Sequence, residues 1–474
     1  MGRSIGAPEK VPAGRVNDAA SGSVIRVELR NGKMFHSLSE DGLSAEYEIR
    51  YRIGAGKVGY SYAAEVGDSL LQSPVSYFKK YGWDVSPGFA GKELLDFDRV
   101  LSGRCLFCHS DARSSSSEKE LKAISCERCH GDTAEHVKRP TAENIVNPSK
   151  LAVRARDSVC EQCHLEGVAR VVNPGKTLYD FKPGMDLEAS MAIYVVKQPM
   201  ADVRAVSQEE QLATSECSKG SGGRLWCGTC HNPHEAAKNR SSEIKAICTG
   251  CHPRLSAAQH AGVTECTSCH MPQRAPSDVA HAALTDHRIL AKPGISAAVA
   301  LAGGLEIRVW RAPPADCEQR DLGLGYVEAG SNSGDERLSE AGSKILESLP
   351  ASESRDDAAV NAALGDIELA RGRAAEAAAL FRRASELDAS SGRFAMLLGV
   401  SLEKSDTEGA MKELRRAMQL DRSLERAYLE LAALYQMDGK PREAQEVLSE
   451  YLKWNPQSVL GRLTERTLTG VKKR

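Results

Sequence analysis

The sequence is poor in aromatic residues, in excess charge and in long apolar runs. Phe, Trp and Tyr make up 5% of its 474 residues, and 62 Lys and Arg against 64 Asp and Glu give a net charge of −2. This balance excludes the strongly basic surface that is typical of nucleic-acid-binding proteins. The longest nearly apolar stretch, residues 295–305, is too short for a transmembrane segment, which takes about 18 or more apolar residues.

Cysteine and histidine, in contrast, form a repeated pattern. Twelve of the 14 cysteines lie in six copies of Cys-x-x-Cys-His. The six copies comprise Cys105, Cys108 and His109; Cys126, Cys129 and His130; Cys160, Cys163 and His164; Cys227, Cys230 and His231; Cys248, Cys251 and His252; and Cys266, Cys269 and His270. The other two cysteines, Cys217 and Cys317, lie outside the pattern.

The motif is the one to which c-type haem is covalently attached. The two thiols are spaced so that each can add to one vinyl group of the porphyrin, and the adjacent histidine supplies the proximal nitrogen ligand of the iron. The sequence therefore predicts six covalently bound haem c groups, with the twelve cysteines as attachment points and the six motif histidines as proximal ligands.

Structural zinc is the alternative interpretation of the cysteines. The gaps between Cys108 and Cys126 and between Cys230 and Cys248 fit the spacing of a zinc ribbon. A zinc ribbon, however, does not need a histidine directly after every second cysteine. We therefore keep a zinc-ribbon scaffold only as an alternative.

Six histidines lie outside the motifs and are candidate distal ligands of the irons. They are His36, His136, His234, His260, His281 and His287. A second imidazole on each iron would give a closed site suited to electron transfer. For any single histidine, and most of all for the remote His36, a core or surface position is the alternative.

The pattern of residues predicts a multidomain chain. Residues 1–98 are expected to be a β-containing region, since residues 24–29 alternate in polarity and Asn31-Gly32 is a hairpin signal. Residues 99–290 are expected to form a hexahaem domain, mostly irregular and α-helical. Its apolar core would consist largely of porphyrin.

The C-terminal part is rich in Ala, Leu and Glu and repeats every 33 to 34 residues. Leu364-Gly365 recurs as Leu398-Gly399 and then as Leu431-Ala432. This predicts an all-α tetratricopeptide repeat (TPR) solenoid over residues 351–470, with a linker at 291–350 that holds a candidate degenerate repeat. Such a solenoid typically docks a protein or peptide partner.

Further stretches of the sequence support a family resemblance. They are Trp83-Asp84-Val85-Ser86-Pro87-Gly88, Leu225-Trp226-Cys227 with Asn232-Pro233-His234, and Thr285-Asp286-His287-Arg288. With the motifs, they resemble bacterial multihaem c-type cytochromes of the tetrahaem and nitrite-reductase-like class with doubled Cys-x-x-Cys-His motifs, fused to a C-terminal TPR domain. The resemblance implies export, haem attachment outside the cytoplasmic membrane, and electron transfer.

The expected function is therefore extracytoplasmic electron transfer between redox donor and acceptor proteins, with a TPR domain for docking and no role in nucleic-acid binding. An alternative is a multihaem oxidoreductase acting on a small nitrogen or sulfur oxyanion, because some members of the wider group reduce nitrite or oxidise hydroxylamine. Since the spare histidines match the motifs in number, an electron carrier is favoured over an enzyme.

The start of the chain conflicts with export, because no basic and apolar segment follows Met1. In the family that the sequence resembles, a Met-Gly-Arg-Ser stretch lies inside the chain, after a signal peptide and a further haem motif. We therefore expect Met1 to be an internal methionine of a longer periplasmic protein with a seventh haem. A true start at Met1 is the alternative.

Overall fold

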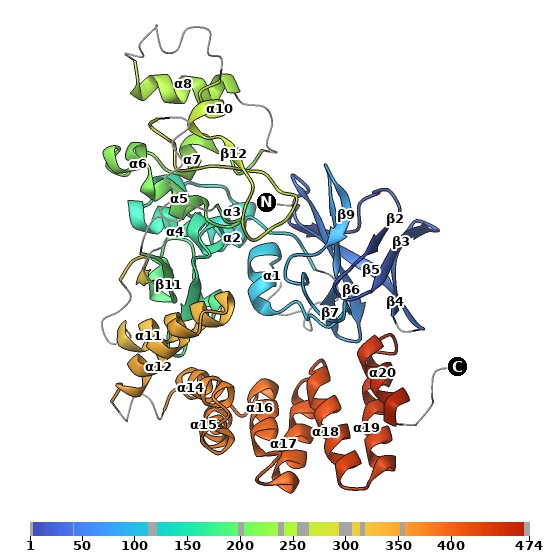
Figure 1. Ribbon diagram of the computed structural model, residues 1–474. Helices are drawn as coiled ribbons and strands as arrows, with labels where there is room; N and C mark the ends of the chain where they lie inside the picture. Colours follow the sequence, from blue (N-terminus) through green and yellow to red (C-terminus); the bar gives the residue numbers. More distant parts are fainter. Residues whose placement is uncertain are drawn as a thin grey trace. The chain divides into compact units, whose positions relative to one another are not determined.

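Two compact units make up the chain (Figure 1). The computed structural model describes residues 3–40, 42–111, 121–197, 203–235, 241–253, 265–292, 306–312, 318–350 and 356–468. The β–repeat unit comprises Ile5–Leu121 and Gln319–Arg474, and the middle unit comprises Met1–Ser4 and Lys122–Glu318. Residues 5–121 and the C-terminal part of the chain therefore fold into one unit, and the part between them forms the other together with the first four residues.

An antiparallel sheet of nine strands forms the first part of the β–repeat unit. The strands are β1 (Ile5–Gly6), β2 (Gly14–Asn17), β3 (Val24–Arg30), β4 (Lys33–Glu40), β5 (Leu43–Ile53), β6 (Gly59–Val66), β7 (Ser69–Gln72), β8 (Val75–Phe78) and β9 (Gly82–Val85). The strand order is β2-β3-β4-β5-β6-β8-β9, with β1 paired to β5 and β7 paired to β6. The indole N–H of Trp83 in β9 donates to the carbonyl of Pro12, just before β2, at 2.8 Å. The sheet therefore curls until the two ends of this path meet.

The turn between β3 and β4 is the hairpin turn that the sequence predicts. Asn31 and Gly32 both have positive φ, 51° and 77°, and Arg30 pairs with Lys33 across the turn. A two-residue turn of this mirror-image type matches the twist of the strands it joins, which is why Asn-Gly is preferred there. The predicted β-rich N-terminal region is confirmed.

Helices from the C-terminal part of the chain also belong to the β–repeat unit and are coloured orange to red in Figure 1. They are α11 (Glu318–Ser333), α12 (Glu336–Glu347), α14 (Ala358–Ala370), α15 (Ala374–Leu387), α16 (Gly392–Leu402), α17 (Thr407–Leu420), α18 (Glu425–Met437), α19 (Pro441–Trp454) and α20 (Val459–Leu468). A Cβ at Gly365 would lie 2.8 Å from the ring of Phe381, and one at Gly399 would lie 2.7 Å from Leu414. Small residues at close helix crossings are what the repeat pattern predicts, and the predicted helical repeats are confirmed.

The last helix of the repeats packs into the sheet. Val459, at the start of α20, is fully buried in the same apolar core as Ile25 and Phe97. The hydroxyl of Tyr47 in β5 donates to the side-chain oxygen of Asn455 at 3.2 Å. The sheet and the end of the solenoid therefore share one core.

The middle unit contains short helices and strands with little apolar core. Its elements are α2 (Glu127–His130), α3 (Ala134–Lys138), α4 (Val153–His164), β10 (Ala169–Val172), β11 (Met191–Val196), α5 (Gln208–Thr214), α6 (Glu216–Gly220), α7 (Cys227–Cys230), α8 (Ser241–Cys251), α10 (Thr267–His270), β12 (Gln273–Arg274), β13 (Leu284–Thr285), β14 (Ile307–Val309), and the 3-10 turns Pro148–Lys150, Leu178–Asp180 and Leu187–Ala189. Strands β10, β11 and β14 form a small antiparallel sheet. Among its described residues, Leu165, Phe181 and Ile193 belong to one buried apolar cluster.

Candidate functional site

Each Cys-x-x-Cys-His motif lies on a short helix, with at most one residue of the motif just before or just after the helix. The helices are α1 (Gly103–His109), α2, α4, α7, α8 and α10. In the second, fourth, fifth and sixth motifs the backbone N–H of the histidine donates to the carbonyl of the first cysteine at 2.9–3.0 Å. Residues at positions i, i+3 and i+4 of a helical turn share one face. The two thiols and the imidazole of a motif therefore lie on the same face, as attachment to one porphyrin requires.

The first motif belongs to a different unit from the other five. Helix α1 lies in the β–repeat unit, where Leu106 and Phe107 of the motif region are buried. The neighbouring Arg104 forms an ion pair with Glu328 of α11 at 2.7 Å. The five remaining motifs all lie in the middle unit.

Hydrogen bonds to backbone carbonyls favour one tautomer of two motif histidines. Nδ1 of His130 lies 2.7 Å from the carbonyl oxygen of Val146, and Nδ1 of His270 is hydrogen-bonded to the carbonyl of Leu290. Since a carbonyl oxygen can only accept, Nδ1 carries the proton and Nε2 carries the lone pair. Metal-binding histidines are held in this way in other proteins.

Two motif histidines face histidines from elsewhere in the sequence. The ring centres of His130 and His234 lie 5.8 Å apart with an angle of 16° between the planes. Those of His231 and His287 lie 6.2 Å apart with an angle of 26°. Each pair joins a predicted proximal ligand to a predicted distal ligand.

The segment that carries His287 is held by a buried carboxylate. Asp286 is fully buried and forms ion pairs with Arg274 at 2.7 Å and with Arg288 at 2.6 Å. Burial opposes its charged form, but the hydrogen bonds from the two arginines prevail and lower the pKa of Asp286. Nδ1 of His287 lies 2.8 Å from the carbonyl of Thr285, so its lone pair is on Nε2. In the Thr-Asp-His-Arg sequence, the residues on either side of His287 therefore hold its imidazole in place.

The other candidate distal histidines have varied surroundings. Nδ1 of His136 lies 2.9 Å from the side-chain oxygen of Asn144. His281 has a φ of 55°, a strained value for a residue other than glycine. His260 lies outside the described residues.

His36 lies inside the sheet of the β–repeat unit. It is fully buried in β4, its Nδ1 is 2.8 Å from the hydroxyl of Ser73, and its ring lies 5.3 Å from those of Tyr62 and Trp83. Burial lowers the pKa of His36 to about 3. Its assignment as an iron ligand stays a prediction, and these surroundings favour the alternative of a core histidine.

Neighbouring motifs approach one another through their cysteines. A hydrogen bond with Cys160 of the third motif, together with burial, raises the pKa of the Cys227 thiol in the fourth. Burial and the nearby thiol of Cys266 raise the pKa of Cys248 to about 11. The electrostatic interaction with Cys230 also raises this pKa. Helices α7 and α8, which carry the fourth and fifth motifs, are in contact.

A buried carboxyl group within the third motif is a feature that the sequence analysis missed. Glu161 is fully buried, and its oxygens accept hydrogen bonds from the indole N–H of Trp310 at 3.0 Å and from Arg311 at 2.9 Å. Burial raises the pKa of Glu161 to about 8. Since the partners lie some 150 residues away in the sequence, no local pattern could have revealed them.

The thiols and imidazoles fit haem better than zinc. In the part of the chain that the structure describes, no three Cys, His, Asp or Glu side chains converge as the ligands of one metal ion would. Structural zinc needs four such ligands around one point. The motifs instead present two thiols and one imidazole each, with the Nε2 lone pair set by the Nδ1 hydrogen bond in His130 and His270. Over the same described residues, no helix is both long and apolar enough to span a bilayer.

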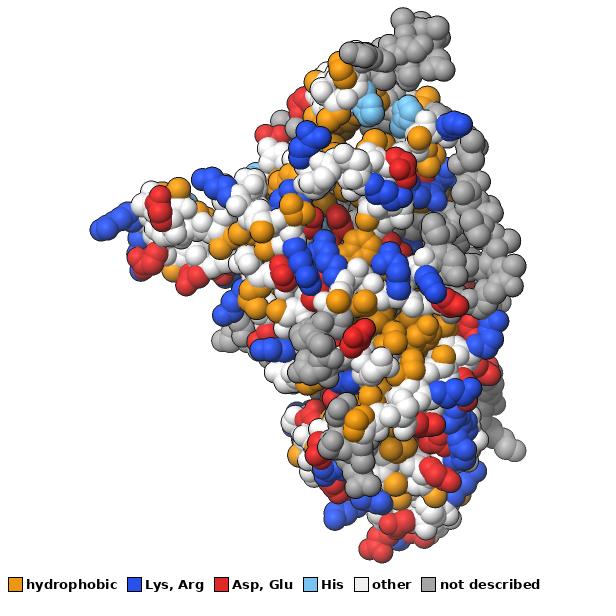
Figure 2. Space-filling model, turned by 90° about the vertical axis from the view of Figure 1, so that its left-hand side faces the viewer, with side chains coloured by type: hydrophobic (Ala, Val, Ile, Leu, Met, Phe, Trp, Pro, Cys, Tyr) orange, Lys and Arg blue, Asp and Glu red, His pale blue; other side chains and the backbone are white. Residues whose placement is uncertain are grey.

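Charges of both signs are mixed over the surface. Figure 2 shows Lys and Arg side chains interspersed with Asp and Glu, in keeping with the small net charge.

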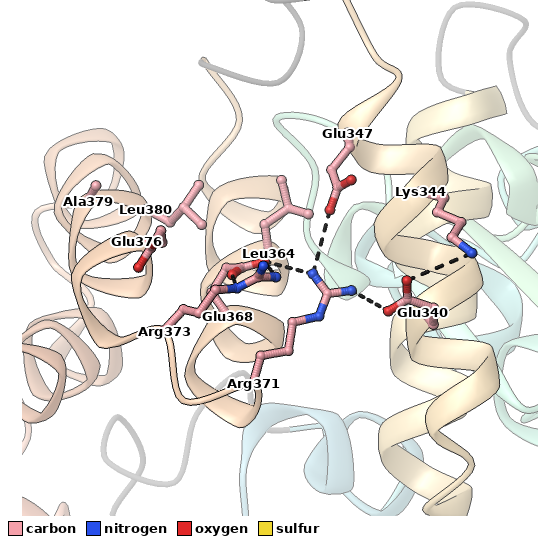
Figure 3. Close-up of a pocket in the computed structure, with 10 residues that line it drawn as sticks. All are labelled: Glu340, Lys344, Glu347, Leu364, Glu368, Arg371, Arg373, Glu376, Ala379 and Leu380. Carbon is pink, nitrogen blue, oxygen red and sulfur yellow. Dashed lines mark hydrogen bonds and ion pairs between the residues drawn. The ribbon is translucent and has the colours of Figure 1, made fainter.

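The repeats contain a cavity of about 940 Å³ between α12, α14 and α15 (Figure 3). In its wall Arg371 forms ion pairs with Glu340, Glu368 and Glu347. The charges of this cavity thus largely pair with one another.

Three family models match separate parts of the chain. The model described as cytochrome c3 matches residues 100–172, the model of a doubled CXXCH motif matches 220–257, and a tetratricopeptide repeat model matches 401–465. A search of curated proteins finds no match.

Several solved structures resemble part of the chain. A structure of MamA is 17% identical to the matched part of this chain and has a TM-score of 0.28. The match covers 30% of this chain and 82% of the MamA chain. The TPR domain of Arabidopsis OM64 is 17% identical, with coverages of 25% and 98% and a TM-score of 0.23. Pseudomonas aeruginosa pilF is 21% identical, with coverages of 32% and 69% and a TM-score of 0.28.

The family matches place a cytochrome c3 segment over the first three motifs, a doubled haem motif over the fourth and fifth, and a tetratricopeptide segment over part of the helical repeats. This combination matches that of a multihaem c-type cytochrome fused to a TPR domain.

Proposed function

We propose that the protein transfers electrons through six covalently bound haems outside the cytoplasm and docks to a protein partner through its repeats. The observation that carries this proposal is the pairing of His130 with His234 and of His231 with His287. Two imidazoles on one iron leave no position for a substrate, so such a site is suited to electron transfer rather than to catalysis.

The motif residues hold the haems. The twelve motif cysteines would form the thioether bonds, and His109, His130, His164, His231, His252 and His270 would supply the proximal nitrogens. When bound, each haem supplies an iron that accepts and releases one electron. The protein fixes the imidazole orientation through hydrogen bonds such as that from His130 to Val146, which keeps the ligand lone pair on Nε2.

The spare histidines close the irons from the other side. His234 and His287 are proposed for the second and fourth motifs, and His136, His281 and His260 are candidates for irons elsewhere in the middle unit. Asp286 and its two arginines keep His287 in place. A rigid, closed site changes little between oxidation states, which favours fast electron transfer.

The exposure of the polypeptide around three motifs supports porphyrin as the core. No residue is buried in the described stretches 125–154, 216–235 and 242–253, which carry the second, fourth and fifth motifs. A protein segment of this size needs buried apolar surface to be stable. Large flat apolar rings attached to these helices would supply it.

The proposal also includes docking to a protein partner and an extracytoplasmic location. The TPR match and the helical repeats support interaction with a protein. An extracytoplasmic location is supported by the cytochrome c3 match, since multihaem c-type cytochromes are generally found there.

The test is the haem content and spin state of the protein expressed with a c-type maturation system. Mass spectrometry under denaturing conditions should show six haems retained on the chain. Electron paramagnetic resonance should show mainly low-spin Fe(III). An apoprotein with bound zinc would overturn the proposal. A large high-spin fraction that binds nitrite or hydroxylamine would favour the oxidoreductase alternative instead.

A further inference from the structure

We infer that the short segment from His231 to His234 joins two haem sites, with His231 on the haem of the fourth motif and His234 on the haem of the second. The fourth haem is thereby a junction between the second and fifth haems. This inference rests on the proposed electron-transfer function and specifies the route.

The ring separations fit two imidazoles on one iron. A bond between a metal and an imidazole nitrogen is about 2 Å long, and the nitrogen lies about 1 Å from the ring centre, so two opposed ligands have ring centres about 6 Å apart. The observed values are 5.8 Å for His130 and His234 and 6.2 Å for His231 and His287. The nearly parallel planes are compatible with two ligands on opposite faces of one haem.

The two pairs determine where His234 binds. Since His231 already faces His287, these two histidines would hold the iron of the fourth motif without His234. His234 instead faces His130 of the second motif, 104 positions earlier in the sequence. The sequence Cys-x-x-Cys-His-Asn-Pro-His therefore ends with a ligand for a haem other than its own.

Asn232 and Pro233 set the spacing between the two ligands. The side-chain oxygen of Asn232 accepts a hydrogen bond from the backbone N–H of His234 at 3.1 Å, which closes a tight turn. Pro233 restricts its own φ, so the turn loses little entropy on ordering. Residues three apart can be separated by at most about 11 Å between Cα atoms, and the turn shortens this. The second and fourth haems are thus neighbours although the third motif lies between them in the sequence.

The fifth motif lies beside the fourth. Helices α7 and α8, which carry these two motifs, are in contact. An electron that reaches the fourth haem therefore has the second and the fifth haems as neighbours to which it can move.

The test uses the intact holoprotein and the spin state of individual haems. His234→Ala should convert one haem in six to high spin, and added imidazole should restore low spin, which shows that the fold is intact. His287→Ala should open a different haem, so that the double variant shows two in six. His234→Ala giving no high-spin haem would overturn the assignment of His234 as a ligand.

A second set of variants identifies the haem concerned. In a Cys126→Ser, Cys129→Ser background, which lacks the second haem, His234→Ala should add no high-spin signal and His287→Ala should still add one. If this background does not fold, His130→Met gives a histidine–methionine haem with its own absorption band. His234→Ala should then abolish that band and His287→Ala should leave it. The opposite pattern in either background would overturn the inference. Failure of the proposed function is distinct, because it would appear in the unaltered protein as missing haems or as open irons.

Discussion

The carboxylate of Asp96 accepts a hydrogen bond from the backbone N–H of Val459 at 2.8 Å and another from that of Leu460 at 3.2 Å. Asp96 follows the last strand of the sheet, and Val459 begins the last helix of the repeats, 363 positions later. The carboxylate thus satisfies the N–H groups at the start of α20, a role that a residue within the helix's own chain segment usually fills. The sheet and the solenoid are joined at this point.

Removing the carboxylate of Asp96 should loosen α20. Asp96→Ala leaves the buried N–H groups of Val459, Leu460 and Phe97 without this acceptor, at a cost of about 1–3 kcal/mol. We expect hydrogen exchange over residues 457–462 to become about tenfold faster or more, because 1.4 kcal/mol corresponds to a factor of ten. Asp98→Ala, at a partly exposed neighbour that pairs with Lys92, is the matched control. Equal exchange rates in the two variants would contradict this role of Asp96.

The same junction should make stability depend on pH. Burial raises the pKa of Asp96 to about 6 and that of Glu425 to about 7, against about 3.9 and 4.3 in an unfolded chain. The folded state therefore binds protons more tightly than the unfolded state between about pH 4 and pH 7. The free energy of unfolding of the β–repeat unit should fall over this range, by on the order of 3 kcal/mol per group, and level off above it.

The pH effect can be isolated by substitution at Glu425. Ser458 donates to Glu425, and Glu425→Gln keeps an oxygen acceptor for this hydrogen bond while removing the titration. Urea denaturation at pH 5 and pH 8 should show a smaller difference in midpoint for the variant than for the unaltered protein. Because titration of the histidines is common to both proteins, it cancels in this comparison. An unchanged difference would show that Glu425 does not titrate in this range.

Local features of the structure could be predicted from the sequence, and long-range ones could not. The hairpin at Asn31-Gly32 and the close helix crossing at Gly365 depend on backbone conformation and side-chain size within a few residues. The six haem motifs likewise depend on spacing within one helical turn. Which histidine faces His130 depends instead on how distant segments approach one another, and no periodicity within 231–234 reveals it.

The unit to which the first motif belongs could not be predicted from the sequence either. The first motif lies next to the second in the sequence, yet α1 belongs with the sheet and with α11, through Arg104 and Glu328. The join between Asp96 and Val459 brings together segments that composition alone separates into two domains. Both are contacts over hundreds of positions, and charge or hydrophobic pattern at either end does not specify the partner.

Substitution of His36 separates its two interpretations. From its place between Tyr62 and Trp83 we expect His36→Ala to leave all haems low-spin and to destabilise the β–repeat unit by about 2–4 kcal/mol through the cavity it creates. The measurements are the spin state at low temperature and the urea midpoint. His136→Ala serves as the comparison, because it should open an iron and leave the sheet unaffected. A new high-spin haem in His36→Ala would instead establish His36 as a distal ligand.

The last prediction concerns Asp286 as a positioning residue for His287. Asp286→Ala leaves Arg274 and Arg288 without their shared buried partner, and breaking a buried ion pair in this way costs about 3–5 kcal/mol. We expect the low-spin resonance of one haem to broaden and part of it to become high-spin, because the imidazole of His287 is no longer held in one orientation. A purely structural role would lower the stability and leave the resonance unchanged.

Two further variants make the test of Asp286 specific. Asp286→Asn keeps one oxygen for the arginines and should restore most of the low-spin signal. Asp186→Ala removes an exposed carboxylate of the middle unit that pairs with Arg154 at 3.3 Å, and it should alter neither signal nor stability measurably. Added imidazole should return Asp286→Ala to low spin, because an external ligand can replace a displaced His287. If the resonance in Asp286→Ala matches that of the unaltered protein, His287 does not need this ion-pair support.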